Sequence, residues 1–299
     1  MTRTERRDLR NGLLFASPYI VGFLVFTFYP FAASVYYSFC EFNAISPPLW
    51  TGLDNYRDML EDKSLHKALI NTLYYTAGSV PVGIAISIFL AVLLNQKLRG
   101  IASYRTVFFL PTIVPLVASA GLWLWVLNPE SGLMNGILRQ IGLDKLVALP
   151  NWLADETWAL PSLILMSYWS VGAAVVIFLA GLADVPQSLY EVADIDGAGP
   201  WRKFRHVTVP MITPTILFNL VMGLIGAFQY FTQVYVMTNG LGGPAESTLV
   251  YALYLYQKAF NYLDMGYASA MGWMLFVVVL LLTIGVMVSS KRWVHYHGE

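Results

Sequence analysis

Six stretches of the chain contain no Asp, Glu, Lys or Arg, and each is at least 24 residues long. A helix of about 20 apolar residues crosses a hydrocarbon layer of about 30 Å. The stretches therefore predict an all-α membrane protein with six transmembrane helices. The predicted spans are approximately residues 12–39, 68–95, 105–128, 157–183, 207–237 and 265–289.

The composition leaves no room for a separate soluble domain. Hydrophobic residues make up 57% of the chain and charged residues 12%, whereas soluble domains average roughly 45–50% and 25%. No polar stretch is long enough to fold alone, so residues 1–299 are predicted to form a single transmembrane domain. The one cysteine, Cys40, excludes an internal disulfide.

The basic residues of the loops predict the orientation of the chain. With six spans both termini lie on one side, and the loops of that side carry twelve Lys and Arg residues against six on the other. Lys and Arg favour the cytoplasmic side of a membrane. The N- and C-termini and the loop 184–206 are therefore predicted to be cytoplasmic.

The loop 184–206 holds the densest cluster of charges in the chain. Acidic residues come first and basic residues follow: Asp184, Glu191 and Asp194, then Arg202, Lys203 and Arg205. Acids favour the start of a helix and bases its end. We expect a short helix from Gln187 to about Asp196, ended by Gly197 and Gly199 with Pro200.

Two prolines interrupt the third predicted span. Pro111 and Pro115 lack the N–H group that a regular helix needs, so the helix is either broken, as in a substrate pathway, or an ordinary membrane helix that tolerates proline. The fifth helix, by contrast, is expected to run unbroken from about Val209 to a turn at 238–244. Short helices are expected at the outer face after Gly52 and within 247–258.

The sequence lacks the short motifs of common catalytic and nucleotide-binding sites. It contains no G-x-x-x-x-G-K-[ST], H-E-x-x-H, C-x-x-C or G-x-S-x-G, so no catalytic residue and no metal site is predicted. None of the six spans carries an acid or a base in its middle, which disfavours a proton- or sodium-coupled carrier. If the chain transports a solute, the energy enters elsewhere.

A longer pattern covers the second half of the charged loop. This pattern resembles the E-A-A-x-x-x-G-x9-I-x-L-P motif of the permease subunits of binding-protein-dependent ABC importers. The residues that match the motif positions are Glu191, Ala193, Gly197, Val207, Val209 and Pro210. The chain departs from the motif at Val192, Val207 and Val209, all small or similar apolar residues. Residues 52–56, 71–72, 108–111, 238–244 and 266–270 are similar to the MalF type of sugar permease, so the resemblance covers nearly the whole chain.

The resemblance implies a fold and a set of partners. The fold is that of type I ABC importer permeases (MetI-like), with a cytoplasmic coupling helix between spans four and five. The partners are a second permease, two ATPase subunits that bind ATP and Mg²⁺, an extracytoplasmic solute-binding protein, the sugar substrate and membrane lipid. No cofactor on this chain and no nucleic acid is implied, and the location is a bacterial or archaeal cytoplasmic membrane.

The same resemblance implies roles for residues of the charged loop. The ATPase-coupling residues are Glu191, Ala193, Asp196, Gly197 and Pro210. Closure of the ATPases would then tilt the fourth and fifth spans, which the coupling helix joins. The alternative is that the loop only connects two spans, with its basic residues setting the orientation.

Small and polar residues share one face of the fifth predicted helix. Gly223, Gly226, Ala227, Tyr230 and Gln233 recur at helical spacing, and Trp169, Ser170 and Ala173 offer a matching set on the fourth. Aromatic faces stack on sugar rings, while hydroxyls and amides bond to sugar hydroxyls. These residues are therefore predicted to line the substrate pathway, with plain helix packing as the alternative for each glycine.

Two other functions stay open at this point. An importer of another polar solute, such as glycerol phosphate, needs Arg or Lys in its cavity, which a partner subunit could also provide. A membrane-embedded enzyme acting on lipid-linked substrates needs paired acids or a metal cluster at the membrane face. Asp194 and Asp196 come nearest to such a pair.

The predicted orientation can be tested with reporter fusions. A reporter fused after Arg205 should report the cytoplasm, and one fused near Lys145 should report the outside, because the bases gather on the side of Arg205. The measurement is alkaline phosphatase and fluorescent-protein activity of each fusion in cells. The reverse pair of signals would contradict the orientation.

Overall fold

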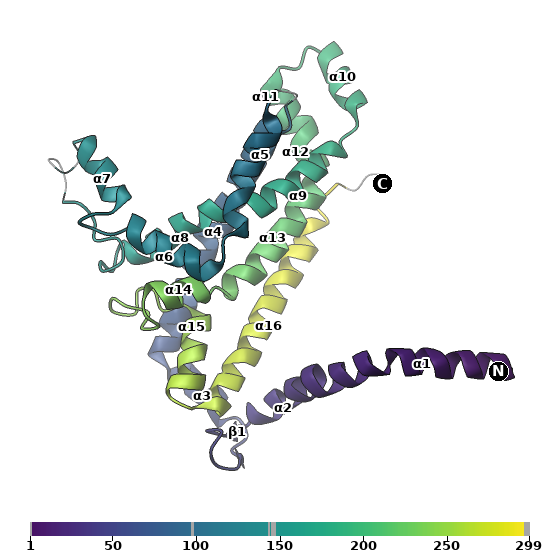
Figure 1. The fold of residues 1–299 in the computed structure, drawn as a ribbon, viewed down its shortest axis with the longest axis vertical. Helices are drawn as coiled ribbons and strands as arrows, with labels where there is room; N and C mark the ends of the chain where they lie inside the picture. Colours follow the sequence, from purple (N-terminus) through teal and green to yellow (C-terminus); the bar gives the residue numbers. More distant parts are fainter. Residues whose placement is uncertain (1, 97–98, 143, 145–147, 296–299) are drawn as a thin grey trace. The chain divides into compact units, whose positions relative to one another are not determined.

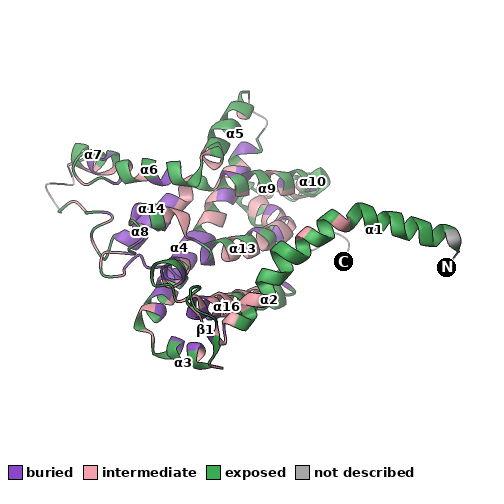
Figure 2. Cartoon of the chain, turned by 60° about the horizontal axis from the view of Figure 1, so that its bottom comes forward, coloured by how far each residue is buried: buried purple, intermediate pink, exposed green. Residues whose placement is uncertain are grey.

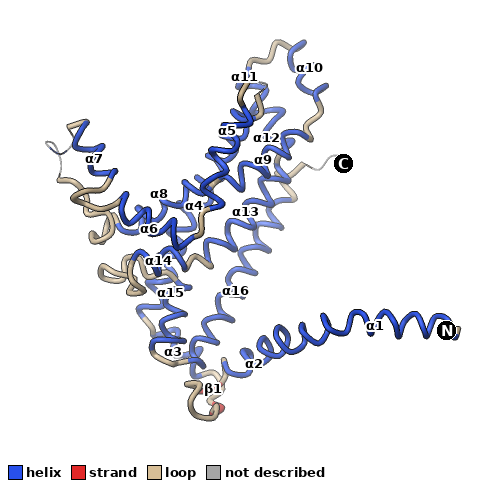
Figure 3. Tube along the Cα trace, in the orientation of Figure 1, coloured by secondary structure: helices blue, strands red, loops and turns tan. Residues whose placement is uncertain are grey.

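The computed structural model describes residues 2–96, 99–142, 144 and 148–295, and its regular structure is almost entirely helical (Figures 1 and 3). The chain divides into two compact units. Unit 1 is Met1–Asp62 with Leu255–Phe276, and unit 2 is Lys63–Tyr254 with Val277–Glu299. The two units are described in turn.

Unit 1 begins with a long apolar helix. Its three parts are α1 (Arg3–Phe23), the π-helical η1 (Leu24–Phe28) and α2 (Tyr29–Tyr37). The helix starts with a capping box, in which Thr2 Oγ1 accepts a hydrogen bond from the Glu5 N–H and the Glu5 carboxylate accepts one from the Thr2 N–H. No residue in the most apolar 18-residue stretch of this helix is buried, and Figure 2 shows α1 almost wholly exposed.

The remainder of unit 1 is built on a short antiparallel ladder. Strand β1 (Cys40–Glu41) pairs with β2 (Leu49–Trp50), and α3 (Asp54–Glu61) supplies the short helix expected after Gly52. The buried Asn55 amide of α3 donates to the carbonyl oxygens of Ser38 (3.0 Å) and Cys40 (2.9 Å). The ladder and α3 therefore hold each other in place.

The C-terminal part of unit 1 contains η6 (Gln257–Asn261) and the first part of α16 (Met265–Ser290). Gly266 lies against β1 so closely that an added Cβ would be 2.0 Å from the Cys40 carbonyl oxygen. Only glycine fits at this position. The Tyr267 hydroxyl donates to Asp62 Oδ2 (2.7 Å), which ties the start of α16 to the end of α3.

Unit 2 holds the other helices, except the last two residues of α15, and the remainder of α16. They are α4 (Lys63–Leu94), α5 (Ile101–Phe109), η2 (Leu110–Ile113), α6 (Leu116–Val126), α7 (Leu133–Gln140), α8 (Ala159–Ser167), η4 (Tyr168–Ser170), α9 (Gly172–Ala183), α10 (Gln187–Ile195), α11 (Pro200–Lys203), η5 (Phe204–Thr208), α12 (Val209–Met211), α13 (Thr213–Phe228), α14 (Thr232–Met237) and α15 (Tyr251–Tyr256). Helix α15 provides the short helix expected within 247–258.

The apolar helices follow the six charge-free stretches. Among the described residues, four helices are long and apolar enough to cross a membrane: Thr4–Tyr37, Lys63–Leu94, Thr213–Met237 and Met265–Ser290. Two bent pairs pass the same test together, and they are Ile101–Ile113 with Leu116–Val126 and Ala159–Ser170 with Gly172–Ala183. The described chain thus has four to six spans, which is consistent with the six predicted.

The third predicted span is a broken helix. Its halves meet at 99°, after the 3-10 turn η2 that contains Pro111 and before α6, which Pro115 precedes. The two prolines remove helical N–H donors at consecutive turns, so the backbone changes direction there. The fourth span bends by 47° at η4, where no proline lies. Its Gly172 leaves room only for backbone, since a Cβ would be 2.4 Å from the Phe108 carbonyl oxygen.

The fifth span differs from the unbroken helix expected from its sequence. Helix α13 ends at Phe228 and α14 begins at Thr232, and Tyr230 lies in the gap. No glycine or proline occurs between 228 and 232. The break coincides instead with the packing of Tyr230, whose ring stacks on Tyr75 of α4 with centroids 4.2 Å apart.

A hydrophobic cluster joins the second, fourth and fifth spans beside the charged loop. Its members are Ala91, Leu94, Val175, Phe178, Leu182, Val185 and Ile212, all buried. Helices α9 and α13 approach closely, because a Cβ on Gly181 would be 2.5 Å from Thr215 Oγ1. The cluster anchors both ends of the segment that carries α10.

The beginning of α4 holds the 238–250 loop through what we call the α4 clamp, made by Ser64, Lys67, Asn71 and Thr72. The Asn71 amide donates to the carbonyl oxygens of Glu246 (2.8 Å) and Leu249 (2.9 Å). Thr72 Oγ1 accepts from the Tyr251 N–H (2.8 Å). Ser64 donates to the Glu246 carboxylate, and Lys67 to the Ala245 carbonyl oxygen. These bonds replace the regular secondary structure that the loop lacks.

Asn71→Ala should destabilise the protein, because it leaves the buried Leu249 carbonyl oxygen and the partly buried Glu246 carbonyl oxygen without their donor. The expected loss is about 1–3 kcal/mol of unfolding free energy. The measurement is thermal unfolding of the purified protein in detergent. Asn151→Ala, at an exposed asparagine, is the control and should change stability by less than about 0.5 kcal/mol. Equal unfolding of both variants would contradict the role of the clamp.

Candidate functional site

Helix α10 ends as the charged loop predicts. Gly197 has a φ of +71°, the left-handed conformation in which glycine is favoured. The N–H of Gly197 donates to the Asp194 carbonyl oxygen (3.0 Å), and the N–H of Ala198 donates to that of Ala193 (2.8 Å). These two bonds form a Schellman motif, which satisfies carbonyl groups at the end of a helix. The small residues of the motif therefore define where α10 stops.

The surface of α10 presents an acid beside large apolar side chains. Glu191 is exposed, and its side chain makes no hydrogen bond or ion pair with any described residue. Ile195 is 86% exposed, Val192 56%, and Trp201 on α11 69%. Exposed apolar side chains that gather in a short charged segment are typical of a protein contact. Ile195 and Trp201 were not predicted as contact residues from the sequence, although their apolar side chains within so charged a segment indicate such a role.

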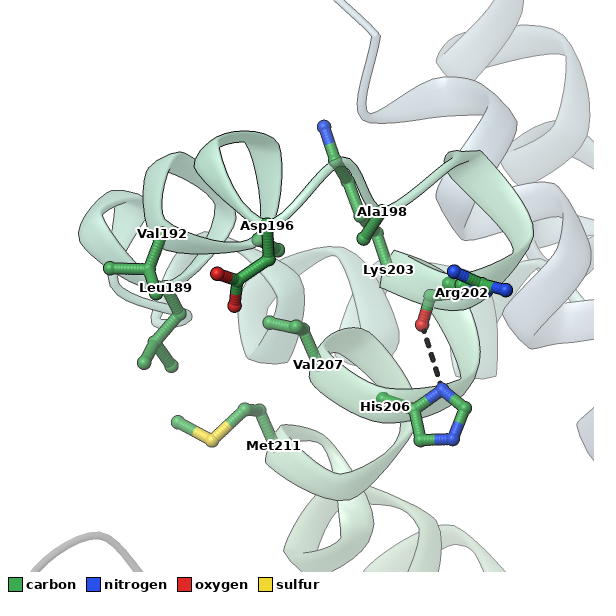
Figure 4. Close-up of a pocket in the computed structure, with 10 residues that line it drawn as sticks. Leu189, Val192, Asp196, Ala198, Arg202, Lys203, His206, Val207 and Met211 are labelled. Atoms are coloured by element: carbon green, nitrogen blue, oxygen red, sulfur yellow. Dashed lines mark hydrogen bonds between the residues drawn. The ribbon is translucent and has the colours of Figure 1, made fainter.

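A hollow of about 720 Å³ lies between α10 and the start of the fifth span. Figure 4 shows Val192 and Asp196 of α10 on one side and Val207 and Met211 on the other. The hollow is also lined by Leu189, Ala193, Ala198, Arg202, Lys203 and His206. Two of the predicted coupling residues, Ala193 and Asp196, thus line the same concave surface.

Two polar contacts connect α10 to the segment that follows it. Asp194 forms an ion pair with Lys203, and Tyr190 Oη lies 3.0 Å from Thr208 Oγ1. The partner of Asp194 is thus a base. No group of His, Cys, Asp and Glu in the described chain could hold a metal ion.

Pro210 follows a π-helical segment. Residues Phe204–Thr208 form η5, and Pro210 lies in the first turn of α12. Proline removes one helical donor and its ring presses on the carbonyl group four residues earlier, so the backbone widens before it. His206 Nδ1 lies 3.1 Å from the Arg202 carbonyl oxygen, in position to donate to it (Figure 4). The same spacing recurs in unit 1, where η1 ends two residues before Pro30.

Two adjacent cavities lie among the second to fifth spans. The tyrosine cavity, about 220 Å³, is lined by Tyr75, Pro111, Thr112, Val114, Leu116, Ser119, Met166, Ser167, Ser170, Ala173, Tyr230 and Gln233. The serine cavity, about 380 Å³, shares Tyr75, Ser167, Ser170 and Ala173 with it, and adds Ser79, Ser87 and Asn219 beside Gly223, Gly226 and Ala227. The structure thus places seven of the eight predicted pathway residues on these two cavities.

The eighth residue lies elsewhere. Trp169 belongs to the η4 turn and packs edge-on against Trp123, with ring centroids 6.3 Å apart. Tyr230 combines the two roles that were considered for it, since it lines the tyrosine cavity and also stacks on Tyr75. Its hydroxyl is buried.

The glycines of the fifth span have different surroundings. A Cβ on Gly223 would be 3.0 Å from Val80 of α4, so this glycine serves close packing of two helices. A Cβ on Gly226 would meet nothing within 4 Å. The sequence spacing predicted that Gly223 and Gly226 share one face of the helix. Only the position of α4 shows that their surroundings differ.

The chemistry of the two cavities is uncharged. Among the described residues that line them, the polar groups are hydroxyls and amides, and none is an acid or a base. Such groups, together with tyrosine rings, are suited to neutral polyhydroxylated molecules. The described lining of these two cavities therefore offers no cation for a phosphate group.

Apolar spans around uncharged cavities, with one short charged helix between the fourth and fifth spans, are typical of a membrane transport subunit. The chain belongs to the family of binding-protein-dependent transport system inner membrane components, whose model matches residues 83–295. The family consists of membrane components of transport systems and not of enzymes.

Similar proteins extend the match to the full chain. A probable ABC transporter permease protein of Bacillus subtilis, YesP, is 42% identical over 100% of this chain and 96% of its own length. The lactose transport system permease protein LacF of Rhizobium radiobacter is 34% identical over 95% of this chain and 96% of its own. A subunit of a bacterial alginate ABC transporter, solved with an alginate-bound periplasmic protein, has a TM-score of 0.81 and 25% identity over 97% of this chain and 98% of its own. The type I importer permease fold predicted from the sequence is confirmed.

Gly226→Leu and Gly223→Leu should distinguish a role in solute passage from a role in helix packing. Gly226→Leu places its side chain in the open serine cavity, so the protein should fold normally while uptake per assembled complex falls. Gly223→Leu is the matched control, because the leucine meets Val80 and should cost about 1–3 kcal/mol of stability. Thermal unfolding and uptake of the solute that the binding protein retains are measured for both. Normal uptake by Gly226→Leu would contradict a pathway at this face.

Proposed function

We propose that the chain forms, with a second permease, the membrane pathway of an ATP-driven importer for a sugar or oligosaccharide. The observation that carries the proposal is the α10 segment, in which a motif of the family coincides with an exposed acid, exposed apolar side chains and a defined helix end. The lactose permease and the alginate transporter among the similar proteins support a sugar as the solute. The uncharged cavities support it further.

The proposal places ATP hydrolysis on separate subunits. The chain has no phosphate-binding loop, so two ATPase subunits with bound ATP and Mg²⁺ dock on its cytoplasmic side. The excess of Lys and Arg in the loops puts both termini and α10 on that side. A binding protein outside delivers the solute, and the alginate transporter in complex with an alginate-bound periplasmic protein supports this arrangement.

The docking contact is formed by α10. Glu191 faces a basic group of the ATPase, while Ile195 and Val192 enter an apolar cleft and lose their exposure to water. Ala193 and Gly197 keep the end of the helix narrow, so the ATPase surface can approach the hollow beside Asp196. Pro210 lies two residues after the π-helical turn through which the fifth span begins. Closure of the ATPases on ATP would move α10 and, with it, the spans on either side.

The pathway for the solute runs along the tyrosine and serine cavities. Ser170 and Ala173 line both, Gly226 and Ala227 line the serine cavity, and Gln233 lines the tyrosine cavity. Tyr230 is buried and lines the tyrosine cavity, where its hydroxyl can bond to a hydroxyl of the solute. An importer of glycerol phosphate is not supported by this chain, since the described residues that line the tyrosine and serine cavities include no Arg or Lys.

Glu191→Lys and Gly197→Trp should uncouple ATP hydrolysis from uptake. The first puts a like charge against the ATPase, and the second strains a backbone with φ of +71°, although no atom lies within 4 Å of the new Cβ. Uptake should fall by about tenfold or more, the effect of losing a charge pair in an interface. Uptake and co-purification of the ATPase are measured together.

Glu156→Lys is the matched control, an exposed acid on the other side of the fourth span. It should leave uptake and assembly unchanged. Normal uptake in both Glu191→Lys and Gly197→Trp would refute the coupling role of α10. A purified chain that assembles with neither a second permease nor an ATPase would refute the proposed function as a whole.

A further inference from the structure

One sheltered hydrogen bond connects α10 with the start of the fifth span. Tyr190 Oη and Thr208 Oγ1 are 3.0 Å apart, and Thr208 is only 6% exposed. Thr208 Oγ1 also lies 3.5 Å from the Lys203 carbonyl oxygen. Because a threonine hydroxyl has one proton, both contacts are satisfied when Thr208 donates to Lys203 and accepts from the Tyr190 O–H.

The other contacts that hold α10 are apolar or exposed. The Tyr190 ring packs against the hydrophobic cluster, and Val185, just before the helix, belongs to that cluster. None of the residues of α10 is buried, and the Asp194–Lys203 ion pair is open to water at the aspartate, which is 65% exposed. Exposed ion pairs hold a geometry weakly. On its other side α10 follows a non-helical turn, residues 184–186, before it reaches α9. The Tyr190 hydroxyl is thus the best-shielded polar contact of the helix.

Thr208 lies at the point where a movement of α10 can be passed to the fifth span. It is the last residue of η5, and its carbonyl oxygen accepts from the Ile212 N–H (3.1 Å). Ile212 is 1% exposed and belongs to the hydrophobic cluster that joins the second, fourth and fifth spans. A π-helical turn has one more residue than an α-helical turn, and such turns often occur at functional sites. Movement of Thr208 therefore reaches the packed core directly.

We propose that Tyr190 is a positioning residue whose hydrogen bond to Thr208 makes α10 move as one body with the start of the fifth span. The inference rests on the proposed function, since it assigns a route to the movement that the ATPases impose. The route runs from α10 through Tyr190 and Thr208 to Ile212 and α13. The ion pair between Asp194 and Lys203 contributes less to this transmission of movement than the Tyr190–Thr208 hydrogen bond.

The test uses the whole complex reconstituted in lipid vesicles: this chain, its second permease and its ATPase. The probe is the solute-binding protein, purified with the solute that it retains. The quantity measured is the stimulation of ATP hydrolysis, the rate with the binding protein divided by the rate without it. Tyr190→Phe and Thr208→Val each remove one partner of the hydrogen bond and little volume.

Each variant should lower the stimulation about fivefold, which corresponds to a coupling of about 1 kcal/mol. The double variant should lose no more than either single variant, because the three share one broken bond. Thr208→Ser keeps the hydroxyl and should restore the stimulation. The unstimulated rate and the yield of complex should stay unchanged, which a loss of folding would not allow.

Tyr56→Phe is the matched control, since Tyr56 Oη lies 2.9 Å from Ser38 Oγ in unit 1, far along the chain from α10. It should keep full stimulation. Full stimulation in Tyr190→Phe and Thr208→Val, or losses that add in the double variant, would overturn the inference while leaving the proposed function intact. A wild-type complex that the binding protein does not stimulate would overturn both.

Discussion

A backbone N–H or C=O group inside a hydrocarbon layer has no water to bond with, and most of this structure follows from that constraint. It favours continuous helices, and it requires a partner wherever a proline interrupts one. Side-chain hydroxyls bond to carbonyl oxygens four residues earlier on α4, from Thr72 to Ala68 and from Thr76 to Thr72. Beside Pro210 the Thr208 hydroxyl and the His206 ring lie close to carbonyl oxygens of the preceding turn.

Irregular backbone in the spans is concentrated around one place. The η2 turn contributes Pro111 to the tyrosine cavity, the η4 turn contributes Ser170, and the break in the fifth span contributes Tyr230. Membrane proteins tolerate such breaks where the backbone faces protein or a polar cavity and not lipid. Three broken helices around one cavity are thus the arrangement expected of a route for a polar solute.

Local chemistry explains which features the sequence could predict. Helix α10 and its end at Gly197 depend on charges, caps and a glycine that lie within a few residues, and the prediction from Gln187 to about Asp196 matches the observed Gln187–Ile195. The break at Tyr230 and the difference between Gly223 and Gly226 depend on Tyr75 and Val80, about 150 residues earlier in the chain. No periodicity within the fifth span contains that information. The π-helical turns before Pro30 and Pro210 were missed because proline predicts a disturbance but not its form.

The α4 clamp also has a consequence for biogenesis. It joins side chains near the start of the second span to backbone that is made 175 to 182 residues later. Contacts of such sequence separation form late, after the intervening chain has been inserted. Until that later segment has been synthesised, the side chains of Asn71 and Thr72 must therefore form hydrogen bonds with water or with their own helix. Order in the 238–250 loop is therefore a sign that the start of the second span has met this later segment.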